Sequence, residues 1–427
     1  MLGVCLSANL EMSCATFASL CNILLTTNEW ELFMKKLTSK LLTGLLTAGL
    51  TLNILGSGVA HAEFSEEIAM NMGKASAGAS HSLIIDADGN VWAWGSTSNG
   101  ALGVGDTGRE KYKLPTKIED FSDVRAVSAA NVSSIALKND GTVWAWGVNI
   151  GDGKRYSESD VPVQVKGLEN VVAVSAGNSH NMVLKDDGTV WAWGSNRVGN
   201  VGNGTKKDVY APVQVSKLSD VKAIATGFQH SLALKNDGTV WAWGGNRNGQ
   251  LGNGFNEDKT TPVRVVGLED VVSIAAGDYH SVALKSDGTV WTWGSNGYGE
   301  LGNGRPGLGE SESGDLNKPT QVPNLDHVDA IAETNGFWTT VLKDDGTVWG
   351  WGRNYEDLIF GDTRGKITTP HQIPEVNDAV AVSSGTQHSL VMKNDGTVWA
   401  WGNNYGNKLL GNEDIEHKSG PVEVFFE

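Results

Sequence analysis

The sequence predicts an all-β protein, a seven-bladed β-propeller of four-stranded antiparallel blades. Three observations predict it: a repeated tryptophan motif, a tight turn before each copy, and four strand-like pieces in each unit without helical periodicity. The motif W-x-W-G takes up 14 of the 16 tryptophans at intervals of 47 to 58 residues. Its seven copies begin at Trp92, Trp144, Trp191, Trp241, Trp291, Trp349 and Trp399.

Each unit offers four short segments rich in strand-forming residues and bounded by turn residues. In the unit around residue 240 they read V-K-A-I-A, H-S-L-A-L-K, T-V-W-A-W-G and P-V-R-V. The second and third segments are joined by Asn236-Asp237-Gly238, and Asp-Gly is typical of a tight hairpin. The dipeptide recurs at Asp88-Gly89, Asp140-Gly141, Asp187-Gly188, Asp287-Gly288, Asp345-Gly346 and Asp395-Gly396. Every unit therefore contains the hairpin.

The paired tryptophans have a structural explanation. In a strand, Trp241 and Trp243 point to one side, while Val240 and Ala242 point to the other. One side of the blade is bulky and the other is small, so stacked blades can interlock. A buried tryptophan removes on the order of 150–250 Å² from water. The glycines that follow let the backbone turn at the edge of the blade.

The segment W-A-W-G-G-N-R-N-G-Q-L-G-N-G, with P-V-x-V and G-x-x-H-S-L-A-L, resembles the repeat of the RCC1 (regulator of chromosome condensation) family. The resemblance covers nearly all of residues 70–427 and implies a propeller of seven blades. Together with the leader described next, it implies a secreted bacterial member of that family. The fold itself carries many unrelated roles, so function has to be argued from particular residues.

The first 62 residues differ from the repeats. Residues 34–62 form a secretory signal peptide: Lys35, Lys36 and Lys40, then an apolar stretch, then Ala60-His61-Ala62 before a cleavage site near Ala62-Glu63. An uncleaved membrane anchor is the alternative. Residues 1–33 are interpreted as an extension upstream of a true start at Met34, or as a long n-terminal region of the leader itself. The propeller is expected over 63–427, in the cell exterior or at the cell surface, with its first and last segments meeting in space.

The composition of the expected mature chain excludes several classes of protein. Cys5, Cys14 and Cys21 precede Met34, so the mature chain has no disulfide. Residues 1–62 hold three basic and three acidic residues, which leaves 30 basic against 46 acidic residues and a net charge of −16. Such a surface repels nucleic acid. No second membrane span and no cofactor motif is found, and a monomer is expected.

Histidine recurs at the start of the second strand of most units. The positions are His81, His180, His230, His280 and His388, with Ser133 and Thr339 assigned to the second and sixth units. A ring of imidazoles would suggest metal or proton chemistry. The preferred interpretation is that each histidine hydrogen-bonds backbone within its own blade.

Other chemical motifs are weak. Asp86-Ala87-Asp88-Gly89 resembles the start of a calcium loop but is read as a hairpin turn, because the later acidic ligands are missing. Glu310, Glu312 and Asp315 lie in the longest loop, where they could hold a hard cation weakly, but a solvated loop is expected. In the sixth unit residues 355–359 depart from the repeat, so that blade edge should look different. There is no phosphate-binding loop, G-x-S-x-G or H-E-x-x-H motif, and therefore no enzyme is predicted.

The candidate partner-binding site lies between the glycine and the histidine of G-x-x-H. These residues enter the second strand, so all units should present them at one end of the propeller. Large residues gather in three consecutive units, and the candidate site residues are Phe228, Asp278, Tyr279, Phe337 and Trp338. Aromatic side chains that packing does not demand suggest a binding patch. Local packing of each aromatic on its neighbouring blade is the alternative.

The function predicted from these observations is an exported, non-enzymatic propeller that binds another protein through one face. The resemblance offers a secreted inhibitor of β-lactamases as one alternative. Aromatic stacking offers a module that binds cell-wall glycan as another. The resemblance also implies guanine-nucleotide exchange, which export makes inapplicable, and a tryptophan-based light sensor, for which only Trp338 lies near the matching loop.

Overall fold

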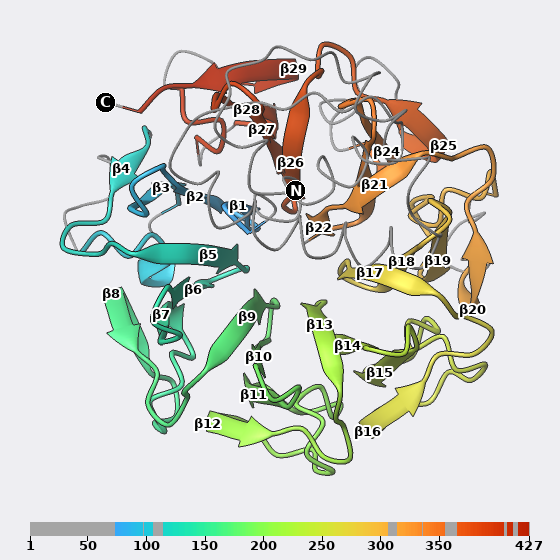
Figure 1. The fold of residues 1–427 in the computed structure, drawn as a ribbon, viewed down its shortest axis with the longest axis horizontal. Coiled ribbons are helices and arrows are strands. Elements are labelled where there is room, and N and C mark those ends of the chain that lie inside the picture. Colours follow the sequence, from blue (N-terminus) through green and yellow to red (C-terminus); the bar gives the residue numbers. More distant parts are fainter. Residues whose placement is uncertain are drawn as a thin grey trace, which may run out of the picture. The chain divides into compact units, whose positions relative to one another are not determined.

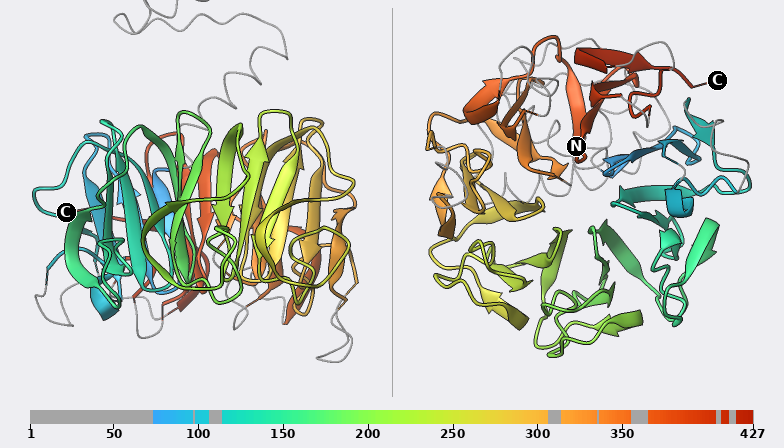
Figure 2. Two further views of the ribbon diagram at one scale, coloured as in Figure 1. Left: turned by 90° about the horizontal axis from the view of Figure 1, so that it is seen from below. Right: turned by 180° about the vertical axis from the view of Figure 1, so that it is seen from behind.

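The computed structural model describes residues 73–96, 98–105, 114–305, 314–334, 336–354, 365–404, 408–412 and 417–426. The chain divides into units 1–60 and 61–427, and all described residues belong to the second unit. Within it, seven sheets stand around a central axis, as the predicted seven-bladed propeller requires (Figure 1). The side view shows the strands running along that axis (Figure 2). None of the described helical segments has the length and apolar character that a membrane crossing requires.

The first four blades consist of consecutive strands, ordered from the innermost to the outermost. Blade 1 comprises β1 (Ala75–Ala77), β2 (His81–Ile85), β3 (Val91–Gly95) and β4 (Thr116–Lys117), with a 3-10 turn η1 (Ser98–Gly100) between the last two. Blade 2 comprises β5 (Val124–Ala129), β6 (Ser133–Lys138), β7 (Val143–Val148) and β8 (Glu158–Gln164). Blade 3 comprises β9 (Val171–Ala176), β10 (His180–Lys185), β11 (Val190–Gly194) and β12 (Val209–Gln214). Blade 4 comprises β13 (Val221–Thr226), β14 (His230–Lys235), β15 (Val240–Gly244) and β16 (Lys259–Arg264).

The last three blades follow the same order, with one addition. Blade 5 comprises β17 (Val271–Ala276), β18 (His280–Lys285), β19 (Val290–Gly294) and β20 (Leu316–Gln321). Blade 6 comprises β21 (Val328–Ile331), β23 (Trp338–Lys343), β24 (Val348–Arg353) and β25 (Lys366–Gln372). Blade 7 comprises β26 (Ala379–Ser384), β27 (His388–Lys393), β28 (Val398–Asn403) and β29 (His417–Val424). The two-residue strand β22 (Glu333–Thr334) leaves blade 6 and pairs in parallel with β26.

The tryptophan pair acts as the sequence predicts. Trp243 is fully buried and packs, with Trp241, in an apolar cluster toward blade 3. Val240 and Ala242 belong to the cluster that blade 4 forms with blade 5. Large and small sides of adjacent blades therefore interlock. The loop glycine Gly252 makes this possible, because a Cβ there would lie 2.7 Å from Nε1 of Trp293 in the next blade.

A hydrogen-bonded latch links most neighbouring blades. His180 Nε2 lies 2.6 Å from Ser231 Oγ in the next blade, and Ser231 Oγ donates at 2.9 Å to the carbonyl of Asn200. Trp243 Nε1 donates to the same carbonyl at 2.9 Å. Because the hydroxyl proton goes to the carbonyl, we assign the Nε2–H tautomer to His180, which donates to Ser231.

The same histidine–hydroxyl bond occurs at four further blade interfaces. The expectation that each histidine bonds backbone within its own blade is therefore wrong. The partners of the other histidines are hydroxyls of the following blade: His81 with Ser134, His230 with Ser281, His280 with Thr339 and His388 with Ser82. Burial lowers the pKa of all five imidazoles to about 3 or 4. The rings are therefore neutral structural groups. Among the described residues there is no group of three or more possible metal ligands.

The ring closes between blades 7 and 1 without any exchange of strands among the described residues. His388 Nε2 lies 2.7 Å from Ser82 Oγ, and Trp94 Nε1 donates at 2.9 Å to the carbonyl of Leu409. The backbone NH of Ala77 donates to Ser383 Oγ at 2.9 Å. The two ends of the repeat array thus meet at a seam, as expected, and each terminal blade is built from consecutive strands.

Candidate partner-binding face

The antiparallel order of each blade assigns every loop to one of two faces. Because β14 pairs with both β13 and β15, residues 227–229 and the Asp237-Gly238 turn lie at opposite ends of the sheet. We call the end with the loops between first and second strands the loop face, and the end with the Asp-Gly turns the hairpin face. The loop that follows W-x-W-G also lies on the loop face, since Gly245 N donates to Gln229 O at 2.8 Å.

Three predicted aromatic side chains meet on the loop face. The rings of Phe228 in blade 4 and Tyr279 in blade 5 have centroids 5.4 Å apart. Tyr279 and Phe337 in blade 6 have centroids 6.0 Å apart. These are normal distances for favourable aromatic pairs. All three side chains are half-buried, so each packs on a neighbouring blade and still presents surface to solvent.

Tyr298, which the sequence analysis missed, extends this row. Its ring lies 5.3 Å from that of Phe337, and the side chain is 37% exposed. The guanidinium of Arg353 lies 4.9 Å from the Tyr298 ring, and the ammonium of Lys366 lies 5.6 Å from it. A signal was present, because Tyr298 stands where the preceding unit has Asn248. We call Phe228, Tyr279, Tyr298 and Phe337 the aromatic ridge.

Asp278 is buried beneath the ridge and forms hydrogen bonds to three other blades. It is 7% exposed, and its Oδ1 accepts a hydrogen bond of 2.9 Å from Asn178 Nδ2 in blade 3. Its backbone carbonyl accepts from Phe228 N at 3.3 Å, and its own NH donates to Gly336 O at 3.0 Å. Burial raises the pKa of the carboxyl to about 6. Asp278 therefore supports the ridge from below, where a partner has little access to it.

The structure does not place Trp338 in the patch. Trp338 is the first residue of β23, pairs with Gly352 as His230 pairs with Gly244, and is only 1% exposed. Its side chain packs in the apolar cluster between blades 6 and 7. Trp338, and not Thr339, thus occupies the histidine position of the sixth unit. The sequence-based assignment was one residue out of register, because it counted from Gly336.

Thr339 accordingly takes the hydroxyl position of the latch. It lies 2.9 Å from His280 Nε2, as Ser281 lies 3.0 Å from His230 Nε2. The corrected pair of loop residues in the sixth unit is Gly336 and Phe337. Phe337 therefore holds the place of Tyr279 in the neighbouring blade, which explains why their rings are adjacent.

Glu300 is a second residue that the sequence analysis missed. The side chain is fully buried under the loop that carries Tyr298. Its carboxylate accepts hydrogen bonds from Tyr298 N at 2.7 Å and Ser295 Oγ at 3.2 Å. Burial raises the pKa of this carboxyl to about 7. The corresponding residue in blade 4 is Gln250, so a titratable group has replaced a neutral one at a buried position.

The remaining sequence candidates have structural roles or lie outside the described residues. Asp86 accepts hydrogen bonds from the side chains of Asn90 and Trp92 at 2.9 to 3.1 Å, as expected of a hairpin. Asp315 accepts from Asn296 N at 2.9 Å and Asn248 Nδ2 at 2.8 Å. Glu310, Glu312 and residues 355–359 are not among the described residues.

Comparison with known proteins identifies the repeats. The family model of the RCC1-like domain matches residues 57–334 and 150–426. The chain is 41% identical over 73 residues to Protein RCC2 of Homo sapiens, a stretch that covers 17% of this chain and 14% of that protein. It is 38% identical over 87 residues to the probable E3 ubiquitin-protein ligase HERC6 of Homo sapiens, covering 19% of this chain and 8% of that protein. The matched segments span less than a fifth of these relatives.

A solved structure agrees with the fold over a larger share of the chain. Yeast RCC1 (Prp20), in its complex with Kap60, superposes with a TM-score of 0.69 at 22% identity. The likeness covers 89% of this chain and 90% of that one. At this level of identity it shows the architecture of the blades and nothing about the residues of the loop face.

Proposed function

The chain belongs to the family of RCC1-like domains, and from this premise we propose that it is an exported, non-enzymatic module that binds a partner protein through the aromatic ridge. The activities of the curated relatives do not carry over, since the matched segments are short parts of those proteins. Export rests on the leader over residues 34–62, which would separate the chain from small GTPases and from chromatin.

The aromatic ridge is the observation that carries the proposal. Four aromatic rings from blades 4, 5 and 6 contact one another in a row, beside Arg353. Most blades have smaller side chains at the two loop places involved: Ala79, Ser80, Asn131, Val132, Asn178, Ser179, Gly336, Thr386 and Gln387. The repeat therefore does not require the rings for folding. Aromatic residues and arginine are the side chains most enriched at the energetic centres of protein interfaces.

The ridge is also held in place before any partner arrives. Ser295 N donates to Tyr279 O, and Arg353 N donates to Phe337 O, each at 2.9 Å. Phe228 is tied through its backbone NH to Asp278. These bonds fix the loop backbone, and the contacts between neighbouring rings restrict the side chains, so the ridge loses little conformational freedom on binding.

The test is capture of partners from culture supernatant by the exported protein. The triple variant Phe228→Ala, Tyr279→Ala, Phe337→Ala should retain the thermal unfolding midpoint of the parent within a few degrees and lose a captured protein. Tyr156→Ala is the matched control, because Tyr156 is an aromatic residue in blade 2 that is 73% exposed. If the triple variant captures the same proteins as the parent, the proposal is wrong. Trp338 is left unchanged because it is a core residue.

The half-buried rings also favour one alternative, stacking on sugars of a cell-wall glycan. Sedimentation with purified peptidoglycan separates the two: a glycan module would sediment through the same three rings without any protein partner. A panel of β-lactamases, assayed with parent and triple variant, tests the inhibitor alternative. N-terminal sequencing of the exported chain tests cleavage near Ala62-Glu63.

A further inference from the structure

Six of the seven blade interfaces are filled by the connection between the two blades. Each connection inserts two apolar side chains, three residues apart, into the cluster between the blades. All twelve side chains are buried. The pairs are Phe121 and Val124, Leu168 and Val171, Leu218 and Val221, Leu268 and Val271, Leu325 and Val328, and Val376 and Ala379.

The seam between blades 7 and 1 joins the last repeat to the first, so no connection between consecutive repeats crosses it. Its cluster contains Ile84, Trp94, Val398 and Val424, but among the described residues it holds no inserted pair. A cavity of about 440 Å³ lies at this place. Its volume is within the range of about 300–1,000 Å³ that is usual for sites that bind small molecules.

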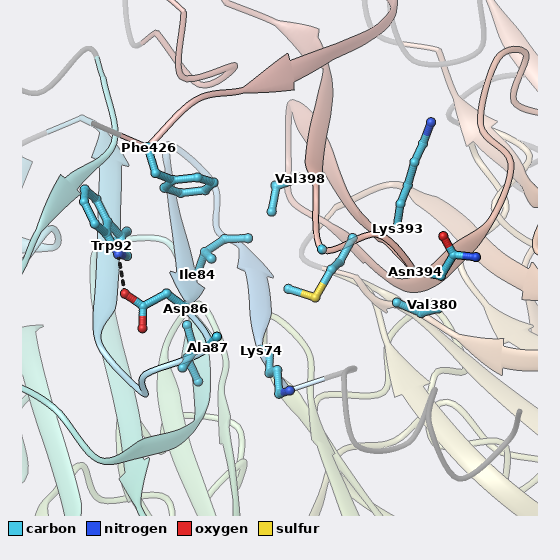
Figure 3. Close-up of a pocket in the computed structure, with 13 residues that line it drawn as sticks. Lys74, Ile84, Asp86, Ala87, Trp92, Val380, Lys393, Asn394, Val398 and Phe426 are labelled. Carbon is cyan, nitrogen blue, oxygen red and sulfur yellow. Dashed lines mark hydrogen bonds between the residues drawn. The ribbon is translucent and has the colours of Figure 1, made fainter. Parts of the chain in front are cut away.

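The walls of the cavity are apolar. Ile84 and Trp92 lie on the side of blade 1, Val398 lies on the side of blade 7, and Phe426 near the C-terminus covers the space between Trp92 and Val398 (Figure 3). Met392 of blade 7 also lines the cavity. A molecule bound here would therefore place an apolar body between the two blades.

Phe426 takes the first of the two inserted places. Its ring lies 5.5 Å from that of Trp92 and 6.2 Å from that of Trp94. Phe121, the first inserted residue of the next interface, lies 5.6 and 5.8 Å from the corresponding tryptophans. The larger side chain of the pair is thus present at the seam.

The second inserted place is open among the described residues. Ile84 and Val398 take the places that Ala233 and Val190 hold at the interface between blades 3 and 4. There the second inserted side chain is Val221, which lies in the same cluster as Ala233 and Val190. The seam cavity therefore offers the room of an aliphatic group between two apolar walls.

Lys74 at the rim of the cavity breaks the repeat. Its carbonyl accepts a hydrogen bond of 2.8 Å from Ile85 N, which places it beside the second strand. Its ammonium forms no ion pair with an acid that the structure describes. A cation thus stands beside the cavity where the repeat needs only a small residue. The other blades have alanine or serine at the equivalent place: Ala126, Ala173, Ala223, Ser273, Ala330 and Ala381.

The other charged groups that line the cavity are engaged elsewhere. The carboxylate of Asp86 accepts hydrogen bonds from the side chains of Asn90 and Trp92 at 2.9 to 3.1 Å. Lys393 extends away from the cavity, and its ammonium lies 4.2 Å from the ring centroid of Trp399 (Figure 3). Of the two lysines in the lining, Lys74 is therefore the one available to a bound molecule.

A molecule that matches this lining has an aliphatic body and one anionic group. A carboxylate suits a single ammonium, whereas phosphate sites usually gather several donors. We propose that the seam cavity binds a fatty acid of medium chain length, with its chain between Ile84 and Val398 and its carboxylate on Nζ of Lys74. The site is independent of the aromatic ridge, because Asp86 and Gly396 of the hairpin turns line it, and the ridge lies on the loop face of other blades.

Methionine methyl NMR on the exported protein tests the site, with sodium octanoate as the probe. The Met392 methyl signal, identified by its loss in Met392→Leu, should shift saturably as octanoate is added. The Met182 methyl is buried between blades 3 and 4, so it is the internal control and should not move. A Met392 signal that does not respond to millimolar octanoate overturns the proposal, and would mean that another part of the chain or a second copy fills the cavity.

The role of charge is tested separately. Lys74→Ala restores the residue type of the other blades and should weaken octanoate binding about tenfold, the size of one charge-assisted hydrogen bond. Lys166→Ala is the matched control, because Lys166 is an exposed lysine of blade 2. Octan-1-ol and octylammonium should bind the parent more weakly than octanoate does. If Lys74→Ala binds octanoate as tightly as the parent, or if the three probes bind equally, the proposal is wrong and the cavity takes up apolar molecules without selecting an anion.

Discussion

The interface between blades 4 and 5 and that between blades 6 and 7 fill the same position with different chemistry. At the first, His230 donates to Ser281 across the interface at 3.0 Å. At the second, Trp338 fills the space with an apolar ring among Leu342, Val391 and other buried residues. The comparison teaches that this position has to be filled, and that a neutral hydrogen-bonded imidazole and a buried indole both fill it.

The two solutions differ in their response to pH. A buried imidazole with a pKa near 3 or 4 has to stay neutral, while in the unfolded chain it takes up a proton below its ordinary pKa of 6.5. An indole has no such response. Interfaces of the first kind therefore make the propeller sensitive to acid, and the interface of the second kind does not.

The largest expected effect is acid destabilisation of the whole ring. Between pH 6.5 and about 4, five histidines bind protons only in the unfolded chain. Asp278 and Glu300, with pKa values raised to about 6 and 7, bind protons preferentially in the folded chain and offset two of these. For these described groups, the net uptake of three protons in the unfolded chain lowers the free energy of unfolding by roughly 4 kcal/mol for each unit of falling pH between about pH 6 and pH 5. Urea unfolding at pH 7.5 and 5.5 measures it.

A matched variant sharpens this test. Trp338→His introduces a sixth latch histidine opposite Ser389, which stands where the other blades have the latch hydroxyl. Its stability should fall more steeply with acid than that of the parent. A parent whose urea midpoint is the same at both pH values would show that the five imidazoles are not held neutral.

The next effect in size concerns Trp338 itself. Trp338→Ala should reduce the free energy of unfolding by roughly 3–5 kcal/mol, because it leaves a cavity between two blades. Phe228→Ala, at a half-buried place on the loop face, should cost much less. Chemical denaturation of the two variants checks the contrast. If both variants lost the same free energy of unfolding, Trp338 would behave as a residue of the surface patch and not of the core.

The repeat allowed most of the fold to be predicted, because its signals are local. The Asp-Gly turns predict which strands pair, and the alternation in W-x-W-G predicts which side chains share one side of the blade. Both signals extend over only a few residues, and the structure confirms both predictions. Partners across a blade interface are some 50 residues away in sequence, so the bond from His180 to Ser231 could not be read from its own unit. That is why the latch was assigned to the wrong partner.

The candidate site was predicted in part for the same reason. Phe228, Tyr279 and Phe337 were found because they break the repeat at equivalent loop places. Trp338 was misplaced because counting from Gly336 overlooked a shift of one residue in the sixth unit, which only the strand pairing with Gly352 reveals. Tyr298 and Arg353 come from another loop and another blade, and their stacking depends on three-dimensional proximity.

The smallest effect compares two loops of the same design. Glu300 stands where blade 4 has Gln250, and both side chains accept a backbone NH two residues earlier, at 2.7 and 3.0 Å. Because burial raises the pKa of Glu300 to about 7, ionisation destabilises the fold as pH rises from 4.5 toward 7.

Glu300→Gln should therefore match the parent near pH 5 and exceed its free energy of unfolding by about 3 kcal/mol at pH 8, since each shifted pKa unit corresponds to about 1.4 kcal/mol. Gln250→Glu is the reciprocal variant and should lose stability at pH 8 alone. Urea unfolding at the two pH values measures both. A gain for Glu300→Gln that is the same at pH 5 and pH 8 would mean that the carboxyl titrates normally, and that the loop carrying Tyr298 holds no buried charge.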